Sequence, residues 1–350
     1  GRFHNKENLA MIYAKQGQLQ SAEELQANIS RIYEAKFGHD YPRTLTSMLN
    51  LAAINKKQGL LERAEELESK VLGIYKQKNN YDHLETLTAM ESLALTYQQQ
   101  GQLSKAEELQ IKVLRNYEEN FGFDYPKTPI AMQNLAMTFA DQGLLNKAEE
   151  LELRVLSICS QIFGPHHPET LTTMRNLALT YKKQDLLKKA EELETEILRI
   201  YKVILGLDNL ETLIAMQNLT VTYKKQGLLS KAEELQIETL RIYKKKLGSD
   251  HPISLTTTQD LALIYQEQGQ LSKAEELQVM VLRICEQKLG HDNSETLNFM
   301  QNLAVTYAKQ GLLKQAEELK NKVLQILEQK LGSDHAETIL AMEKLAFAIE

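Results

Sequence analysis

The sequence predicts an all-α fold in which pairs of antiparallel helices repeat along the chain. Two observations predict it: the glycines fall on a regular lattice, and one tetrapeptide recurs at twice the lattice spacing. Fourteen of the 16 glycines lie 21 residues, or a multiple of 21, from one another: Gly17, Gly38, Gly59, Gly101, Gly122, Gly143, Gly164, Gly206, Gly227, Gly248, Gly269, Gly290, Gly311 and Gly332. The other two lattice points hold Asn80 and Asp185, residue types that tolerate a positive φ. A glycine between segments of helical period is typical of a left-handed residue that ends a helix, so each helix should span about 15–18 residues.

The repeating unit is 42 residues long, because alternate segments differ in content. In the first kind, called helix A, Met174, Leu177 and Tyr181 follow the i, i+3, i+7 spacing of one helix face. The second kind, called helix B, opens with Ala-Glu-Glu-Leu and continues with apolar residues such as Val155. This tetrapeptide occurs eight times, 42 residues apart, starting at Ala22, Ala64, Ala106, Ala148, Ala190, Ala232, Ala274 and Ala316. A repeat of this kind predicts a solenoid, in which each unit packs only on its neighbours.

Start signals support the same division. Ser104 with Glu107 is a capping-box pattern that predicts the start of a helix B, and Asp208 with Glu211 is the same pattern before a helix A. Equivalent pairs are Asn146 with Glu149, Ser230 with Glu233, Ser272 with Glu275, Asp82 with Glu85, Asp292 with Glu295, and Asp334 with Glu337. Prolines are expected just inside the start of helix A at Pro42, Pro126, Pro168 and Pro252.

Composition limits the functional classes. The net charge is −6, which argues against a nucleic-acid or anionic-membrane partner. No apolar run reaches the roughly 18 residues of a membrane helix, and no signal-like leader opens the chain. Two cysteines cannot form a disulfide framework, and Cys159 and Cys285 are predicted to be packing residues. We therefore expect a cytoplasmic protein.

Catalytic and cofactor motifs are missing from the sequence. The glycines end helices, so no phosphate-binding glycine loop occurs, and neither H-E-x-x-H nor C-x-x-C is present. His83, His167, His251 and His335 share one position before helix A, where single histidines are expected to cap turns rather than to bind metal. The sequence predicts a protein that is not an enzyme and has no cofactor and no metal site.

The helix A sequence Leu177-Ala178-Leu-Thr-Tyr181, the turn glycine and the alanine five residues later resemble the tetratricopeptide repeat (TPR). With its 42-residue period and its turn Leu289-Gly290-His-Asp, the chain is similar to the kinesin light chain type. The phrase Glu-Thr-Leu-Thr-Thr-Met-Arg-Asn-Leu-Ala also resembles repeat arrays in fungal and bacterial NLR-like (NB-ARC–TPR) signalling proteins. The resemblance covers residues 1–350 as a single solenoid of about eight repeats.

Each expected repeat contains one turn between helix A and helix B. These turns lie at Gly17, Gly59, Gly101, Gly143, Asp185, Gly227, Gly269 and Gly311. Residues 337–350 are expected to form a helix A without a partner, so we expect the chain to be a fragment of a longer protein.

The sequence departs from the family in the middle of helix B. Many TPRs have an aromatic residue there, whereas this chain has Gln110, Glu152, Glu194 and Gln236. We expect this position to be exposed, so that helix B buries a narrower face.

The resemblance implies a right-handed superhelix whose helices A line a concave groove that binds a protein or peptide. In the family, an asparagine in helix A forms a ladder along the groove, and it occurs here at Asn8, Asn50, Asn134, Asn176, Asn218 and Asn302. A carboxamide can donate to and accept from the backbone of an extended peptide. The alternative is that the asparagines bond the neighbouring helix and set the repeat spacing, and the sequence leaves both open.

Other candidate groove residues flank the ladder. Polar candidates are Gln133, Arg175 and Gln217, and basic candidates at the end of helix A are Lys183 and Lys225. The lysines either attract an acidic ligand or complement the helix dipole. We favour the helix-dipole interpretation. An apolar row, Met137, Leu179, Val221, Leu263 and Val305, either meets the ligand or packs against the preceding helix B.

Three functions remain open. The first is a non-enzymatic scaffold that binds an extended peptide or partner segment, which we favour. The second is a sensor or autoinhibitory domain of a larger NTPase signalling protein. The third is a self-assembly element that associates end to end through uncapped ends, where Phe347 and Ile349 would be exposed.

Overall fold

The computed structural model describes residues 2–78, 83–332, 335–336 and 338–340, with side chains from Leu9 onward. This part of the chain is helical and contains no strand. Its helices are α1 (Arg2–Lys15), α2 (Leu19–Phe37), α3 (Pro42–Lys57), α4 (Leu61–Gln77), α5 (Leu84–Gln99), α6 (Leu103–Asn120), α7 (Lys127–Asp141), α8 (Leu145–Ile162), α9 (Pro168–Lys183), α10 (Leu187–Ile204), α11 (Leu210–Lys225), α12 (Leu229–Leu247), α13 (Pro252–Glu267), α14 (Leu271–Leu289), α15 (Ser294–Lys309) and α16 (Leu313–Leu331). The all-α prediction is confirmed.

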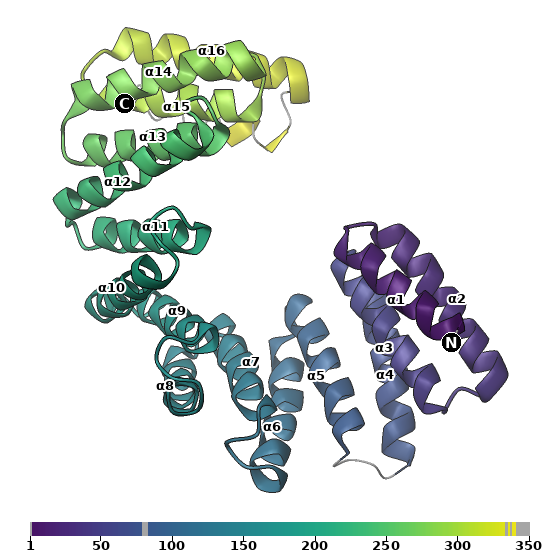
Figure 1. The fold of residues 1–350 in the computed structure, drawn as a ribbon. Helices are drawn as coiled ribbons and strands as arrows, with labels where there is room; N and C mark the ends of the chain where they lie inside the picture. The colour runs from purple at the N-terminus through teal and green to yellow at the C-terminus, as the bar shows by residue number, and fades with distance from the viewer. Residues whose placement is uncertain (1, 79–82, 333–334, 337, 341–350) are drawn as a thin grey trace. The chain divides into compact units, whose positions relative to one another are not determined.

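The chain divides into two compact units, residues 1–184 and 185–350. Odd-numbered helices are the helices A of the sequence and even-numbered helices are the helices B (Figure 1). Within each unit, each helix packs against the next one in the chain. The terminal helix expected over 337–350 lies outside the described residues, except for 338–340, which are helical.

The glycine lattice sets the ends of the helices. All fourteen lattice glycines have a positive φ, and among the described residues Asp185 is the non-glycine residue that shares this conformation, at 61°. At the end of α7, Gly143 has φ 77°, and the Leu144 N–H donates to the Phe139 carbonyl at 2.8 Å. This six-residue bond satisfies a carbonyl that the helix leaves unpaired, so the glycine both ends the helix and reverses the chain.

The longer turn from helix B to helix A is held by a threonine. The Thr170 hydroxyl donates to the Gly164 carbonyl at 2.8 Å. The same bond joins Thr44 to Gly38, Thr128 to Gly122 and Thr212 to Gly206. Stacked rings cross this turn in three repeats: Phe37 with Tyr41, Phe121 with Tyr125 and Phe163 with His167.

The predicted capping boxes of helix B are wrong. Helix α6 begins at Leu103, so Ser104 already lies in its first turn, and Gln102 is an N-cap without a side-chain bond. Glu107 instead accepts a hydrogen bond from Gln142 Nε2, 2.8 Å away at the end of the next helix A. The equivalent bonds are Gln100 to Glu65, Gln184 to Glu149, Gln268 to Glu233 and Gln310 to Glu275. The glutamate is engaged by the following repeat, so it ties two repeats together instead of closing its own helix.

The cap of helix A lies one residue later than predicted. Asn209, not Asp208, is the N-cap of α11, and its Oδ1 accepts from the Glu211 N–H at 2.9 Å. Asn293 caps α15 in the same way. His167 and His251 accept through Nδ1 at this position, so their predicted capping role is confirmed. Asp82, Asp334 and Glu337 lie outside the described residues.

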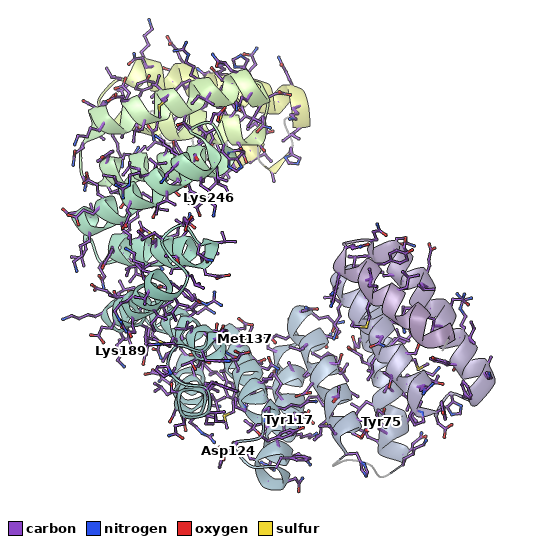
Figure 2. All side chains as sticks on the ribbon, viewed as in Figure 1. Tyr75, Tyr117, Asp124, Met137, Lys189 and Lys246 are labelled. Atoms are coloured by element: carbon purple, nitrogen blue, oxygen red, sulfur yellow. The ribbon has the colours of Figure 1, made fainter. Side chains whose placement is uncertain are left out.

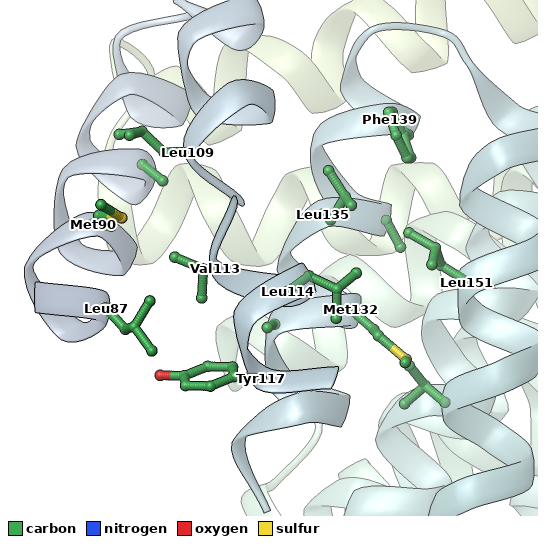
Figure 3. Packing of buried hydrophobic residues seen from close by; sticks show 14 of the residues in the cluster. Leu87, Met90, Leu109, Val113, Leu114, Tyr117, Met132, Leu135, Phe139 and Leu151 are labelled. Atoms are coloured by element: carbon green, nitrogen blue, oxygen red, sulfur yellow. The ribbon is translucent and has the colours of Figure 1, made fainter. Parts of the chain in front are cut away.

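Within a unit, buried apolar clusters connect several consecutive helices. In residues 1–184, Leu87 and Met90 of α5, Tyr117 of α6, and Met132 and Leu135 of α7 belong to one buried cluster (Figure 3). The fully buried alanines Ala94, Ala136 and Ala148 belong to the same cluster, and Ala106 is fully buried as well. Small side chains at these positions let neighbouring helices approach closely, so a larger residue there would overpack the interface.

Candidate functional site

A row of polar side chains is buried in the middle of the helices B. This inner polar row consists of Gln26, Glu68, Gln110 and Glu152 in residues 1–184, and of Glu194, Gln236 and Gln278 in residues 185–350. Each of these residues is 5% exposed or less. The expectation that Gln110, Glu152, Glu194 and Gln236 are exposed is therefore wrong. Helix B buries its full face because the polar position points at the next helix A, where most of the row finds hydrogen-bonding partners.

The partner is usually a threonine 28 residues further along the chain. Thr96 donates to Glu68 at 2.5 Å, and Thr180 donates to Glu152 at 3.1 Å. In residues 185–350, Thr222 donates to Glu194 and Thr306 donates to Gln278. A buried hydroxyl and a buried acceptor therefore satisfy each other between consecutive repeats.

Where isoleucine replaces this threonine, the glutamine turns to a different partner. Ile54 and Ile264 occupy the threonine position opposite Gln26 and Gln236. Gln26 Nε2 then donates to the Ser47 Oγ and carbonyl, both at 3.1 Å, and Gln236 Nε2 donates to the Thr257 carbonyl at 3.0 Å. The row thus keeps a hydrogen bond to the next helix A in both kinds of repeat, except at Gln110, whose side-chain oxygen and nitrogen are buried without a partner among the described residues.

The carboxylates of the row differ in their surroundings. Glu68 Oε1 forms an ion pair with Lys56 Nζ at 2.8 Å and accepts from Ser92 Oγ at 2.5 Å, while Thr96 occupies Oε2. Lys56 Nζ also donates to the Ser92 carbonyl at 3.2 Å. Three polar groups, the Ser92 hydroxyl, the Ser92 carbonyl and the Thr96 hydroxyl, therefore surround this charge pair.

The Glu152 carboxylate has fewer hydrogen-bonding and charged partners than the Glu68 carboxylate. Thr180 bonds its Oε1, while Oε2 is buried and has no hydrogen-bond partner among the described residues. Burial raises the pKa of Glu152 from 4.5 to about 7, against the smaller lowering effects of the Thr180 hydrogen bond and the Lys183 charge. This carboxyl group therefore titrates near neutral pH.

The helices A present an exposed side that we call the A-face. It carries the apolar row, in which Met137 and Leu179 are 47% and 51% exposed, and Met137 is labelled on α7 in Figure 2. Met11, Leu95, Val221 and Val305 share this exposed position, and Leu263 is half-buried. The sequence leaves two alternatives for this row, contact with a ligand or packing against the preceding helix B. Packing against helix B does not bury these side chains.

The asparagine positions lie one helical turn before the apolar row on the same face. Asn50, Asn134, Asn176, Asn218 and Asn302 are all half-buried, while the side chain of Asn8 lies outside the described residues. The hydrogen bonds between repeats that the structure describes come from other positions, such as Gln142 to Glu107. Gln133, Arg175 and Gln217 are also half-buried beside the asparagines.

The basic residues at the ends of the helices A are partly neutralised. Lys183 is exposed and lies 3.9 Å from Asp141 Oδ1, and Lys224 pairs with Glu267 at 3.1 Å. Lys56 is the buried partner of Glu68. Lys225 is exposed. Much of the positive charge that the sequence places at this edge is therefore balanced by carboxylates.

Three further features bear on the chemistry of the described residues. No group of three or more histidine, cysteine, aspartate or glutamate side chains in this part of the chain is arranged to hold a metal ion. None of its helices combines the length and the apolar character needed to cross a bilayer. Cys159 and Cys285 are buried free thiols, which confirms that they are packing residues.

Solved structures of similar fold include several repeat proteins. The Podosopora anserina putative kinesin light chain nearly identical TPR-like repeats are 26% identical, over 57% of this chain and 95% of that chain, with a TM-score of 0.53. BtubC (BKLC) from P. vanneervenii is 22% identical, over 66% of this chain and 92% of that chain, with a TM-score of 0.54. The resemblance to kinesin light chain-like repeats is thus confirmed.

A third similar structure is a Signal Transduction ATPase with Numerous Domains (STAND) protein with a tetratricopeptide repeat sensor, from Pyrococcus horikoshii. It is 16% identical, over 100% of this chain and 50% of that chain, with a TM-score of 0.66, so the likeness is one of fold.

Among curated proteins, no sequence matched the chain. A tetratricopeptide repeat family model matches residues 3–77, 85–159, 128–202 and 211–287, and a second model of the same description matches residues 296–337. These matches cover most of the sequence and agree with the 42-residue unit, the left-handed turn residues and the paired helices. The chain therefore belongs to the tetratricopeptide repeat family.

Proposed function

We propose that the chain is a non-enzymatic scaffold that binds an extended peptide or partner segment along the A-face. The observation that carries this proposal is the exposed apolar row: at one position of the helices A, large exposed side chains recur at Met11, Leu95, Met137, Leu179, Val221 and Val305, while Ala53 and the half-buried Leu263 interrupt the row. Exposed apolar side chains that recur in register favour association, because a bound segment would remove them from water.

The flanking amides suit the backbone of such a segment. The half-buried carboxamides of Asn134 and Asn176 lie one turn from Met137 and Leu179. An extended peptide has unpaired N–H and C=O groups, and a carboxamide can bond both. Gln133, Arg175 and Gln217 lie on the same side of the helices and would contact the same segment, with Lys183 and Lys225 at its edge favouring acidic side chains.

The apolar row is tested by capture from a library of random peptides displayed on phage. The variant Met137→Ser with Leu179→Ser should lose the captured peptides. The matched control is Leu153→Ser, because Leu153 is 44% exposed but lies on α8, a helix B. Peptides that bind the double variant as tightly as the parent would refute the A-face as the binding surface.

The asparagines are tested separately. The triple variant Asn134→Ala, Asn176→Ala and Asn218→Ala should abolish peptide capture while leaving helicity and melting nearly unchanged. A triple variant that unfolds would assign the ladder a structural role instead.

Two other hypotheses remain predictions. A sensor domain of a larger NTPase requires a nucleotide-binding domain in the same gene, which sequencing of the flanking regions would show. Self-assembly requires light scattering that rises with concentration and that falls when Phe347 and Ile349 are replaced by polar residues.

A further inference from the structure

One buried ion pair in the array shows how the interior next to the A-face accommodates an ammonium group. Lys56 Nζ lies 2.8 Å from Glu68 Oε1 and donates to the Ser92 Oγ at 2.8 Å and to the Ser92 carbonyl at 3.2 Å. The Lys56 side chain is 13% exposed and the Glu68 side chain is fully buried. The ammonium group therefore lies just beneath the surface, between a helix B carboxylate and the next helix A.

Two repeats later the same carboxylate recurs without its lysine. Glu152 occupies the position of Glu68, and Thr180 that of Thr96, but Ala140 stands where Lys56 would be. Asn176 replaces Ser92, so the position still offers a backbone carbonyl and a side-chain oxygen. In the sequence, Lys182 stands twelve residues before Glu194, just as Lys56 stands twelve residues before Glu68. Glu152 is therefore the carboxylate of the inner polar row that has an alanine in the lysine position.

The second carboxylate oxygen of Glu152, Oε2, is able to accept a cationic partner. Its Oε2 is buried without a partner among the described residues, although the residue is only 3% exposed. A buried carboxylate oxygen without a donor is costly, and a paired cation relieves that cost. The other charged groups that act on Glu152 are Lys183 of α9 and Glu149 of α8. Lys183 is 40% exposed and lies 3.9 Å from Asp141, so it does not fill the place of Lys56.

We propose that Glu152 is the receptor for the ammonium group of a lysine side chain that a bound protein segment inserts beside Ala140. The inserted ammonium would bond the Glu152 carboxylate, the Asn176 carbonyl and the Asn176 Oδ1. This inference rests on the proposed binding of a segment along the A-face and adds a side-chain preference to it.

The position favours lysine over arginine and over a neutral side chain. Lysine carries three N–H donors on one nitrogen. These donors match the three oxygens that Lys56 Nζ contacts, which are Glu68 Oε1, the Ser92 carbonyl and the Ser92 Oγ. Arginine is a planar fork suited to one carboxylate in two-point contact. Asn176 belongs to the A-face and is half-buried, so the inserted side chain would pass beside it from the bound segment to Glu152.

The probe is Nα-acetyl-lysine methylamide, with the norleucine analogue as a neutral control of similar length. The readout is the carboxyl carbon NMR shift of Glu152, assigned by its disappearance in the Glu152→Gln variant. The lysine probe should ionise Glu152 at neutral pH and move its shift at millimolar concentrations, whereas the norleucine probe should not. An equal response to both probes, or no response to either, would overturn the proposal.

Two variants sharpen the test. Ala140→Lys supplies the ammonium from the chain itself, so it should ionise Glu152 and weaken the response to the lysine probe by about tenfold or more. Glu152→Gln should weaken probe binding to a similar degree and should fold, since Gln110 occupies the equivalent buried position. The matched control is Glu119→Gln, which removes an exposed carboxylate of the helix B α6 and should leave the response to the lysine probe unchanged.

The outcome is separable from that of the proposed function. Peptides captured through Met137 and Leu179 whose lysine can be changed to norleucine without loss would refute the Glu152 site alone. A chain that captures no peptides but binds the lysine probe at Glu152 would refute the proposed scaffold function and leave the ammonium site standing.

Discussion

Thr180 of α9 donates a hydrogen bond to Glu152 Oε1 of α8, 3.1 Å away, and so joins two consecutive helices inside the core. In the equivalent place, Glu68 has Thr96, Ser92 and Lys56 as partners. The same backbone arrangement therefore holds one carboxylate as part of a saturated charge pair and another as an acid that titrates near neutral pH.

The first prediction concerns the pH dependence of stability at Glu152. Its pKa is about 7 in the folded chain against an ordinary 4.5, so the unfolded chain loses its proton first as pH rises. The free energy of unfolding should therefore fall between pH 4.5 and 7, by at most about 3 kcal/mol. Glu152→Gln should remove this slope and stabilise the chain at pH 8, as measured by urea unfolding across pH. An unchanged slope would contradict the assignment.

The second prediction concerns the Lys56–Glu68 pair. Lys56→Met should destabilise the chain by about 3–5 kcal/mol, because it leaves the Glu68 carboxylate buried without its cation. Adding Glu68→Gln to that variant should recover much of the loss, since Gln26 and Gln278 occupy this position elsewhere in the chain. Chemical denaturation of the two single variants and the double variant measures the coupling. A double variant as unstable as the sum of the singles would show that the charges are not coupled.

The third prediction concerns the bond between Gln142 Nε2 and Glu107, which ties two repeats together at 2.8 Å. Gln142→Ala and Glu107→Ala should each cost about 0.5–1.5 kcal/mol, and the double variant should cost less than their sum. Strict additivity in denaturant unfolding would mean that the bond contributes nothing. Glu108→Ala is the control, since Glu108 bonds only Lys112 within its own helix.

The fourth prediction compares two turn residues of one kind. Gly143 has φ 77° and nothing within 4 Å of an added Cβ, so Gly143→Ala carries only the cost of the left-handed conformation, about 1–2 kcal/mol. Asp185 already adopts this unfavourable conformation in the folded chain, at φ 61°, so Asp185→Gly should be neutral or stabilising. Thermal melting of both variants checks the contrast. Equal melting losses for the two changes would contradict it.

The helix pattern could be predicted from the sequence because it depends on local residue types. A glycine at the 21-residue spacing, or Asp185 in its place, predicts a left-handed turn residue. This prediction requires no knowledge of contacts with distant residues. The apolar spacing of Met174, Leu177 and Tyr181 likewise predicts a buried face, and all three are buried.

The inner polar row could not be predicted in the same way. Glu68 and Gln110 are residue types that ordinarily lie at the surface, and burial becomes acceptable only because the next helix A brings polar side chains opposite them. The pairing of position i with position i+28 follows from how neighbouring helices are aligned, which composition does not reveal. The recurrence of Thr96, Thr180 and Thr222 at this spacing was a signal that could have found it.

The helix starts were misplaced for a related reason. Ser104 and Glu107 have the spacing of a capping box, but the glutamate side chain is engaged by Gln142 from the next repeat. A local motif was therefore overridden by a bond between repeats. The roles of Asn134, Asn176 and the other ladder residues stay predictions, because they concern a ligand and not the fold.

Bonds between adjacent repeats recur at the same pair of positions, as in Gln100 to Glu65 and Gln142 to Glu107. Excision or duplication of one whole 42-residue module would therefore bring equivalent donors and acceptors back into register at the new seam. Such a gene could lengthen or shorten by recombination between its own repeats, and the span available to a partner would change without any need to redesign the interior.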